Sequence, residues 1–377
     1  MTDVSSETTP TGASPIRAPE VGSETGSEPA DVATGPISLS RRLRQPRTII
    51  SIVIPVAVIV AFVYLNRDTL GKVPGLVLGA NPLLVAAAFI IFYSGFPLRG
   101  WRWARLLHGT GISITLRDSA EIIFLGWLVN CVVPAKLGDV YRAYLLKINS
   151  TASLSRTLGT VFIERILDLL VIAVLGLGAG FWSFRTGLPP SIEVVAIIGV
   201  IVVIVLAGGL LTLRNFGRSI LVRLPLPSGL EHRIMELYDR FEEGVFGAIG
   251  RRALPGLLIA SVLIWGTESM RLYLVVQALG FPGVDLGLSG AVFVALIGSL
   301  LTAVPLSPAG LGIVEAGVVG VLTAAYGVPL PEATAIALLD RVISVFSIIV
   351  LGSIVYLLSS KPAGARAAAS RETSPAA

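Results

Sequence analysis

The sequence predicts an all-α integral membrane protein. Of its 377 residues, 54% are hydrophobic and only 14% are charged. The mean hydropathy of +0.82 is far above that of a soluble domain. Apolar runs recur that match the roughly 20 residues a helix needs to cross the ~30 Å hydrocarbon core. We therefore expect about six full transmembrane helices, at 48–65, 82–98, 157–184, 192–213, 253–280 and 331–358.

Two further apolar regions, 119–147 and 287–327, are interrupted by Pro and Gly. The distribution of Lys and Arg predicts how they lie, because basic loops stay in the cytoplasm. Basic residues gather before the first span, in an expected 98–118 loop with Trp101 and Trp103 as interface anchors, in 214–252, and after 358. The alternate loops hold only Arg67, Lys72 and Arg185. Both termini should therefore be cytoplasmic, in a multi-pass protein of the cell membrane.

Keeping all the basic loops on one side requires each interrupted region to enter and leave by the same face. Each region is then a re-entrant helical hairpin or a pair of short complete helices, and the count of basic loops allows both. The first region would return to the cytoplasm and the second would return to the outside.

The domain organisation follows from composition. Residues 1–44 are rich in Ser, Thr, Gly, Pro and acids and predict a disordered cytoplasmic tail, as do residues 359–377. The membrane domain spans 45–358, with an amphipathic cytoplasmic linker at about 214–252. One cysteine, two histidines and no nucleotide-binding motif predict neither a metal nor another cofactor.

The two interrupted regions carry related motifs. PAKLGDV begins at Pro134 and PAGLGIV begins at Pro308. Glu164 and Arg165 follow 30 residues after the first proline, and Asp340 and Arg341 follow 32 residues after the second. Three spans separate the copies, so the second is reversed in the membrane. The pattern predicts an inverted-topology repeat, about 82–184 and about 253–358, with a transport site near the midplane.

The charged pairs should lie deep in the membrane. Helices that start near Ser155 and Pro331 place Glu164 and Asp340 nine residues in, or roughly 14 Å deep. Ionisable groups at that depth are functional candidates. Adjacent helical residues point about 100° apart, so each pair needs partners on other helices. The alternative is a buried ion-pair network that only sets helix register, with the prolines as ordinary kinks.

Four segments in order resemble a known family: GWLVNCVVPAKLGDVYRAYLL, TLGTVFIERILDLL, PLSPAGLGIVEAG and LLDRVIS. The sequence is similar, over roughly 45–358, to the membrane domain of lysylphosphatidylglycerol synthase/flippases and of stand-alone flippase-like proteins. The resemblance implies that the domain moves a lipid between leaflets, either an aminoacylated phospholipid or a polyprenyl-phosphate-linked lipid. Residues after 358 leave no room for the soluble aminoacyl-transferase domain, so we expect a transporter and no such enzyme activity.

Candidate residues come from both sources. The family's motif positions correspond to Asn130, Pro134, Gly138, Asp139, Arg142, Glu164, Arg165, Asp168, Pro308, Gly312, Glu315, Asp340 and Arg341. The residues themselves add Arg102, Lys136, Glu268 and Arg271 as substrate-binding candidates and Gly310 as a hairpin break. Arginines would hold a phosphate by paired hydrogen bonds, and acids would meet a cationic group or a coupling proton.

The expected function is lipid translocation by alternating access between the two repeats. Membrane lipids are the expected partners, a coupling proton and a homo-oligomer are left open, and nucleic acid is not expected. One alternative is a secondary transporter of a small soluble solute. The other is a membrane glycosyltransferase that uses a lipid-phosphate donor.

Overall fold

The computed structural model describes residues 71–133, 136–184, 228–250, 252–302 and 307–362, with isolated positions between 197 and 219. The described residues are helical or lie in connections, and none of them forms a strand. The expected tail at 1–44 and span at 48–65 lie outside this part of the chain, as do Pro134 and most of 192–213 and 359–377.

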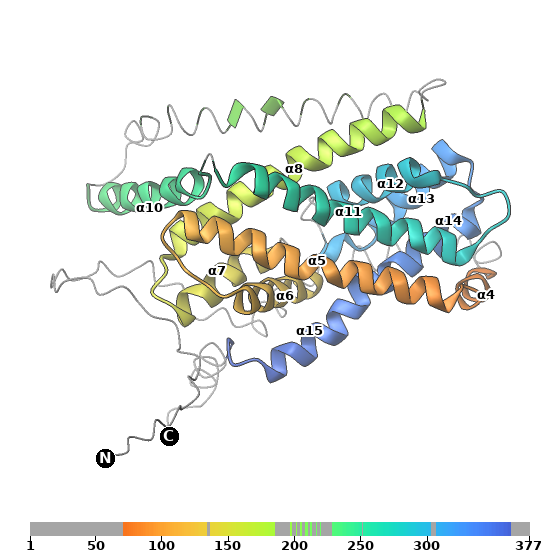
Figure 1. Cartoon of the computed structure of the whole chain (residues 1–377), viewed down its shortest axis with the longest axis horizontal. Coiled ribbons are helices and arrows are strands. Elements are labelled where there is room, and N and C mark those ends of the chain that lie inside the picture. Colours follow the sequence, from red (N-terminus) through yellow and green to blue (C-terminus); the bar gives the residue numbers. More distant parts are fainter. Residues whose placement is uncertain are drawn as a thin grey trace, which may run out of the picture. The chain divides into compact units, whose positions relative to one another are not determined.

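The first half of the described chain contains five helices (Figure 1). These are α4 (Val73–Leu78), α5 (Pro82–Gly109), α6 (Leu116–Val132), α7 (Leu137–Asn149) and α8 (Leu154–Ser183). The later elements are α10 (Ser228–Gly247), α11 (Leu254–Leu279), α12 (Gly287–Leu301), the short turn η1 (Pro308–Gly310), α13 (Ile313–Tyr326), α14 (Leu330–Arg341), the π-helical η2 (Val342–Phe346) and α15 (Ser347–Leu358).

Four segments are long and apolar enough to cross a membrane: Pro82–Gly109, Leu254–Leu279, Pro308–Tyr326 and Leu330–Leu358. Three of them correspond to the spans expected at 82–98, 253–280 and 331–358, and the first extends beyond its expected end to Gly109. The helix expected at 157–184 is present as α8, with 30 residues. The structure is therefore all-helical with several membrane-length helices, as the composition predicted.

The prediction of a loop over 98–118 is wrong, because α5 continues to Gly109 and tolerates Pro97 inside it. Arg99 and Arg102 are 4% and 1% exposed, so they are interior residues of this helix. Trp103 is fully buried and donates to the Thr160 hydroxyl, so it does not anchor the chain at an interface. The prediction from the distribution of basic residues assumed that these arginines are solvated. In the structure, acids on other helices neutralise them.

The helices α6 and α7 form the first hairpin, which turns back to the end of the molecule where it starts. The Lys361 ammonium lies 2.6 Å from the Asp118 carboxylate at the start of α6. The Asn149 amide at the end of α7 donates to the carbonyl oxygen of the same Lys361 at 3.0 Å. The start of α6, the end of α7 and the end of α15 therefore lie together.

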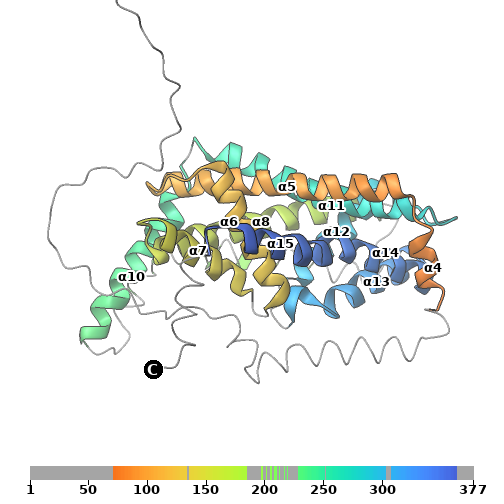
Figure 2. The same cartoon turned by 90° about the horizontal axis from the view of Figure 1, so that it is seen from below.

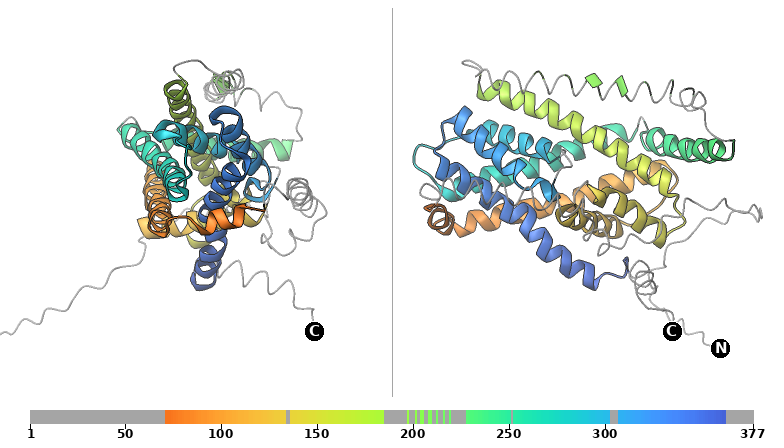
Figure 3. Two further views of the ribbon diagram at one scale, coloured as in Figure 1. Left: turned by 90° about the vertical axis from the view of Figure 1, so that its right-hand side faces the viewer. Right: turned by 180° about the vertical axis from the view of Figure 1, so that it is seen from behind.

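The second hairpin, α12 and α13, turns back at the opposite end. The Ser183 hydroxyl at the end of α8 bonds Ser289 at the start of α12, and the Phe184 ring lies 5.3 Å from the Tyr326 ring at the end of α13. Because α8 starts near α7 and ends here, the two hairpins open in opposite directions. Seen from behind, α8 (yellow-green) crosses the bundle between these ends, with α10 packed on its first turns (Figure 3).

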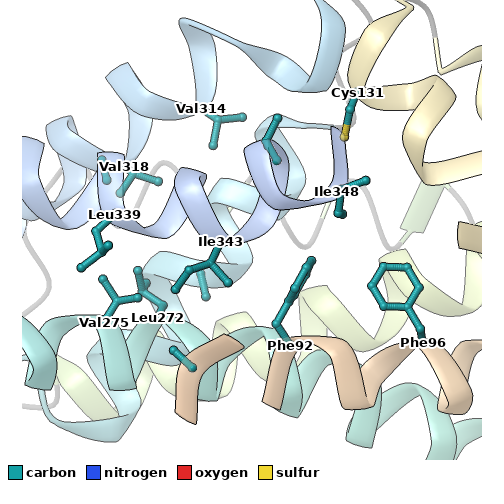
Figure 4. Packing of buried hydrophobic residues seen from close by; sticks show 14 of the residues in the cluster. Phe92, Phe96, Cys131, Leu272, Val275, Val314, Val318, Leu339, Ile343 and Ile348 are labelled. Carbon is teal, nitrogen blue, oxygen red and sulfur yellow. The ribbon is translucent and has the colours of Figure 1, made fainter. Parts of the chain in front are cut away.

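The two hairpins are held around a pair of long helices, α5 and α11, which pack along each other (Figures 1 and 2). The amide of Asn81 at the start of α5 donates to the Ala278 carbonyl near the end of α11. Buried apolar side chains from α5, α6, α11, α13, α14 and α15 fill the space between them, including Phe92, Leu272, Val314, Ile343 and Ile348 (Figure 4).

Close backbone contact holds the first hairpin together. The Asn130 side-chain oxygen accepts the amide of Gly138 at 2.8 Å. A Cβ at Gly138 would lie 1.9 Å from the carbonyl oxygen of Gly126, so only glycine fits there. Gly138 was expected at the hairpin break, and it lies just after that break, in the first turn of α7, where it lets α6 and α7 touch.

Gly138→Ala is expected to lower the free energy of unfolding by about 1–3 kcal/mol, because a methyl group would push the two helices apart. Denaturant titration of the purified protein in detergent measures the change. Gly178→Ala on α8 is the matched control, since its added Cβ meets nothing within 4 Å. Equal stability of the two variants would contradict the close approach of α6 and α7.

Candidate functional site

Six charged side chains of the first half form a closed ring, called here the ion ring. Its members alternate in sign and come from α5, α7 and α8: Arg102, Glu164, Arg142, Asp139, Arg165 and Asp168. The Arg102 guanidinium lies 2.9 Å from Glu164 and 2.6 Å from Asp168. Arg165 holds both oxygens of Asp139, at 3.0 and 2.9 Å. Alternation of charge neutralises the ring in the interior, where unpaired charges are costly.

The second half carries an open version of this arrangement, called here the ion chain. Arg99, Glu268, Arg271 and Asp340 follow one another, and Arg271 binds both oxygens of Asp340 at 2.8 and 3.0 Å. Separately, Arg341 contacts the Glu315 carboxylate at 2.7 Å and donates to the carbonyl oxygen of Ala309. The prediction that Glu164, Arg165, Asp340 and Arg341 find partners on other helices is confirmed.

Both halves connect their charges in the same way. The acid of each pair, Glu164 or Asp340, binds an arginine of the long helix before the hairpin. The arginine of each pair binds an acid of the hairpin's second helix 26 residues earlier. Both acids also stand ten residues after the start of their helix, at Leu154 and Leu330. The related motifs therefore correspond to related three-dimensional arrangements.

The halves differ at two positions. A separation of 176 residues relates Arg165 to Arg341, and the same separation relates Arg142 to Val318 and Asp168 to Ser344. The second half thus lacks the arginine and the acid that close the ring. Its long helix also contains the π turn η2 directly after Arg341, a distortion that often occurs at functional sites.

The two halves touch through α5 and α11, and the ion chain itself joins them, since its member Arg99 belongs to the first half. Arg99 of α5 bonds Glu268 of α11 at 2.6 Å, and Arg102 donates to Ser261 at 2.7 Å. The Trp265 indole donates to Asp168 at 3.1 Å. The ionic core is therefore shared between the halves, and displacement of one half against the other would strain these bonds.

A cavity of about 220 Å³ lies between the hairpins and the ionic core. The charged residues that line it are Lys136, Asp139, Arg165, Asp168, Glu268, Arg271, Asp340 and Arg341. The apolar residues that line it include Trp127, Leu169, Ile172, Leu272, Val294, Val314, Val318 and Val345. A lining that combines charged and apolar side chains suits a ligand with a charged head and a hydrocarbon part.

Strained backbone marks both hairpin tips. Lys136 and Ala309 each have φ of 51°, and they are the non-glycine residues with positive φ among those described. Gly310 and Gly312 follow with φ of 70° and 85°. Such conformations cost about 1–3 kcal/mol and cluster at binding sites. Lys136, Ala309 and Gly310 all line the cavity.

The structure divides the candidate residues into two groups. Those that line the cavity are Asn130, Lys136, Asp139, Arg165, Asp168, Glu268, Arg271, Gly310, Asp340 and Arg341. Those behind its wall are Arg102, Gly138, Arg142, Glu164, Pro308, Gly312 and Glu315, and Glu315 holds the amide of Gly312 at 2.6 Å. No cluster of three or more potential metal ligands occurs among the described residues.

Sequence reasoning missed Arg99, Ser261 and Trp265. Arg99 was treated as a loop residue, although it stands one helical turn before Arg102. Pro97 and Gly100 are both signals that commonly end a helix, so the local sequence did not indicate that α5 continues to Gly109. Nothing in the sequence singled out Ser261 or Trp265, since both lie in an ordinary apolar helix.

These features define an α-helical membrane protein in which two opposed hairpins meet around an ionic core. The chain belongs to the family of the lysylphosphatidylglycerol synthase TM region, whose family model matches residues 48–352. The resemblance found in the four sequence segments is thereby confirmed.

Several curated proteins are similar to this chain. A UPF0104 membrane protein of Methanocaldococcus jannaschii is 35% identical over 231 residues, which cover 61% of this chain and 93% of the relative. A UPF0104 membrane protein of Methanothermobacter thermautotrophicus is 29% identical, covering 73% and 83%. The glycosyltransferase AglD of Haloferax volcanii is 28% identical, covering 74% of this chain and 49% of that protein.

Proposed function

We propose that the protein moves a phosphate-bearing lipid between the leaflets of the cell membrane. The observation that carries this proposal is the cavity between two oppositely directed hairpins, which is lined by both charged and apolar side chains. Translocation needs a polar path for the head group while the hydrocarbon tails stay in lipid. A site with broken helices at the centre of a membrane bundle meets that need.

The equivalent connection of charges in the two halves supports an inverted-topology repeat, about 82–184 and about 253–358. In this proposal about six full spans accompany two re-entrant hairpins, both termini are cytoplasmic, and the halves alternate in opening the cavity. The contacts of Arg99 with Glu268 and of Trp265 with Asp168 would then break or shift as the halves move.

In this proposal the two groups of candidate residues have different tasks. Arg102, Arg142 and Glu164 are 1–2% exposed and joined by ion pairs through Glu164, so their task is to hold α5, α7 and α8 in position. Substrate contacts belong to the residues that line the cavity. Arg165 and Arg341 combine the two tasks, because each lines the cavity and also binds an acid of a hairpin.

Purified protein reconstituted in phosphatidylcholine liposomes should speed the movement of acyl-labelled fluorescent phosphatidylglycerol between leaflets. A membrane-impermeant quencher measures the fraction of label in the outer leaflet over time. Arg165→Gln and Arg341→Gln should each slow the movement at least about tenfold, since each substitution frees a hairpin acid. Arg240→Gln, which removes a partly exposed pair with Glu236 on α10, away from the cavity, should leave the rate unchanged.

Movement no faster than in protein-free liposomes, for this and for polyprenyl-phosphate-linked lipids, would reject the proposal. Full rates in both arginine variants would reject the assigned site. Arg341→Gln combined with Glu315→Gln separates loss of folding from loss of transport, because the double variant leaves no unpaired buried charge.

A membrane glycosyltransferase that uses a lipid-phosphate donor is the second candidate, favoured by the similarity to a protein named glycosyltransferase AglD. Sugar transfer from a radiolabelled lipid-phosphate donor, with no movement of intact lipid, would select it. A secondary transporter of a small soluble solute is distinguished by uptake of that solute into liposomes with no movement of labelled lipid.

A further inference from the structure

The charges of the two networks do not balance. Six arginines and six acids of the networks contact one another: Arg99, Arg102, Arg142, Arg165, Arg271 and Arg341 with Asp139, Glu164, Asp168, Glu268, Glu315 and Asp340. These twelve residues sum to zero. Lys136 is a seventh cation at the same site, so the described ionic core carries one surplus positive charge.

Lys136 stands where a ligand can reach it. It lines the cavity at the tip of the first hairpin, directly before α7, and its side chain is half-buried. Among the described residues it has neither an ion pair nor a side-chain hydrogen bond. Its counterpart two residues after Pro308 is Gly310, which has no side chain to balance or duplicate it. The surplus charge therefore belongs to one wall of the cavity.

The arginines are poorly placed to supply an anion site. Arg165 and Arg271 each donate from two nitrogens to one carboxylate. Arg341 donates to Glu315 and to the Ala309 carbonyl oxygen. An incoming phosphate would have to compete with a carboxylate for each of them. The ammonium of Lys136 needs no such exchange, and an ammonium is a strong point-charge partner for phosphate.

An unmatched charge in a membrane interior is costly, and an anion that enters the cavity removes that cost. A head group with one net negative charge would bring the core to neutrality. A zwitterionic head would leave the surplus, and a head with a net positive charge would raise it to two. Electrostatics at this depth therefore discriminates between lipids that share a phosphate.

We propose that Lys136 binds the phosphate of a head group with net negative charge, and that the cavity disfavours cationic, aminoacylated head groups. This deepens the proposed function and rests on it for the assumption that the ligand is a lipid. The shared chemistry is a phosphate anion, which a lipid or free phosphate could supply.

Lipid binding to the purified full-length protein in neutral detergent tests the proposal, with native mass spectrometry as the readout. The lipids are phosphatidylglycerol, phosphatidylcholine and lysyl-phosphatidylglycerol, which have matched acyl chains and differ in head-group charge. Wild-type protein should bind phosphatidylglycerol at least about tenfold more tightly than the lysyl form. Lys136→Gln should abolish this preference, and Lys136→Arg should keep it.

Lys72→Gln is the matched control, because Lys72 is exposed before α4 and does not line the cavity. Competition by inorganic phosphate would support a site that recognises phosphate alone. Preference for phosphatidylglycerol without such competition would support recognition of the lipid. Equal binding of anionic and lysyl lipids to wild-type protein, or an unchanged preference in Lys136→Gln, would overturn the proposal.

The liposome assay separates this inference from the proposed function. Head-group preference that depends on Lys136, without movement of any lipid, would reject translocation and leave the anion site standing. Lipid movement in Lys136→Gln with the wild-type head-group preference would reject the anion site and leave translocation standing.

Discussion

Glu164→Gln is expected to lower the free energy of unfolding by about 3–5 kcal/mol, the cost of leaving a buried charge without its partner. Glu164 is 2% exposed and lies 2.9 Å from Arg102 and 2.9 Å from Arg142. The neutral amide would leave the ion ring with three arginines and two acids. Denaturant titration of the purified protein in detergent, followed by tryptophan fluorescence, measures the loss.

Glu243→Gln is the control for this substitution. Glu243 pairs with Arg156 at 2.8 Å, but its side chain is 50% exposed, so the pair should contribute at most about 1 kcal/mol. Similar losses in the two variants would show that the ion ring is no more important than an exposed pair.

Removal of Arg271 should be as costly as removal of Glu164, and removal of its partner at the same time should be much less costly. Arg271→Gln strands Asp340, to which Arg271 makes two hydrogen bonds. We expect a loss of about 3–5 kcal/mol for the single variant. The double variant Arg271→Gln/Asp340→Asn contains no stranded charge, so it should recover at least about half of that loss.

This double-mutant cycle also separates the effect on stability from the effect on transport. The double variant should still fold but fail to move labelled lipid, because the lining of the cavity would have lost two charged residues. The unfolding free energies of the wild type, of Arg271→Gln, of Asp340→Asn and of the double variant give the coupling energy between Arg271 and Asp340. A coupling near zero would contradict the pairing, and full transport by the double variant would remove these residues from the assigned path.

Much of the helical framework could be predicted from hydropathy. The apolar runs at 253–280 and 331–358 correspond closely to α11 and to the continuous helical segment α14–η2–α15, because a helix that must satisfy its own backbone in lipid needs about 20 apolar residues. The end of α5 was missed for the reverse reason. Arg99 and Arg102 lower the hydropathy of its last turns, and a rule based on solvated charge cannot recognise an arginine neutralised by Glu268 or Asp168 from another helix.

The sequence identified the residues of the candidate site by their type and position, but it did not identify which residues contact one another. The repeated pairs at Glu164 and Asp340 and the two proline motifs pointed to the correct elements, since charged residues inside apolar helices are rare. Which arginine meets which acid was not accessible, because the partners are separated by as many as 169 residues. The expectation that arginines hold phosphate assumed that their guanidinium groups are unpaired. In the structure these groups are bound to carboxylates, so a phosphate would have to displace them.

The sequence by itself determined that this chain is a helical membrane protein with two interrupted regions and related charged pairs. It did so because hydropathy, proline and glycine act through local backbone chemistry. Only the tertiary structure decided that the first half closes an ion ring while the second half leaves an open chain. The tertiary structure also showed that Lys136 is the surplus cation of the core, because pairing of charges depends on which helices pack together.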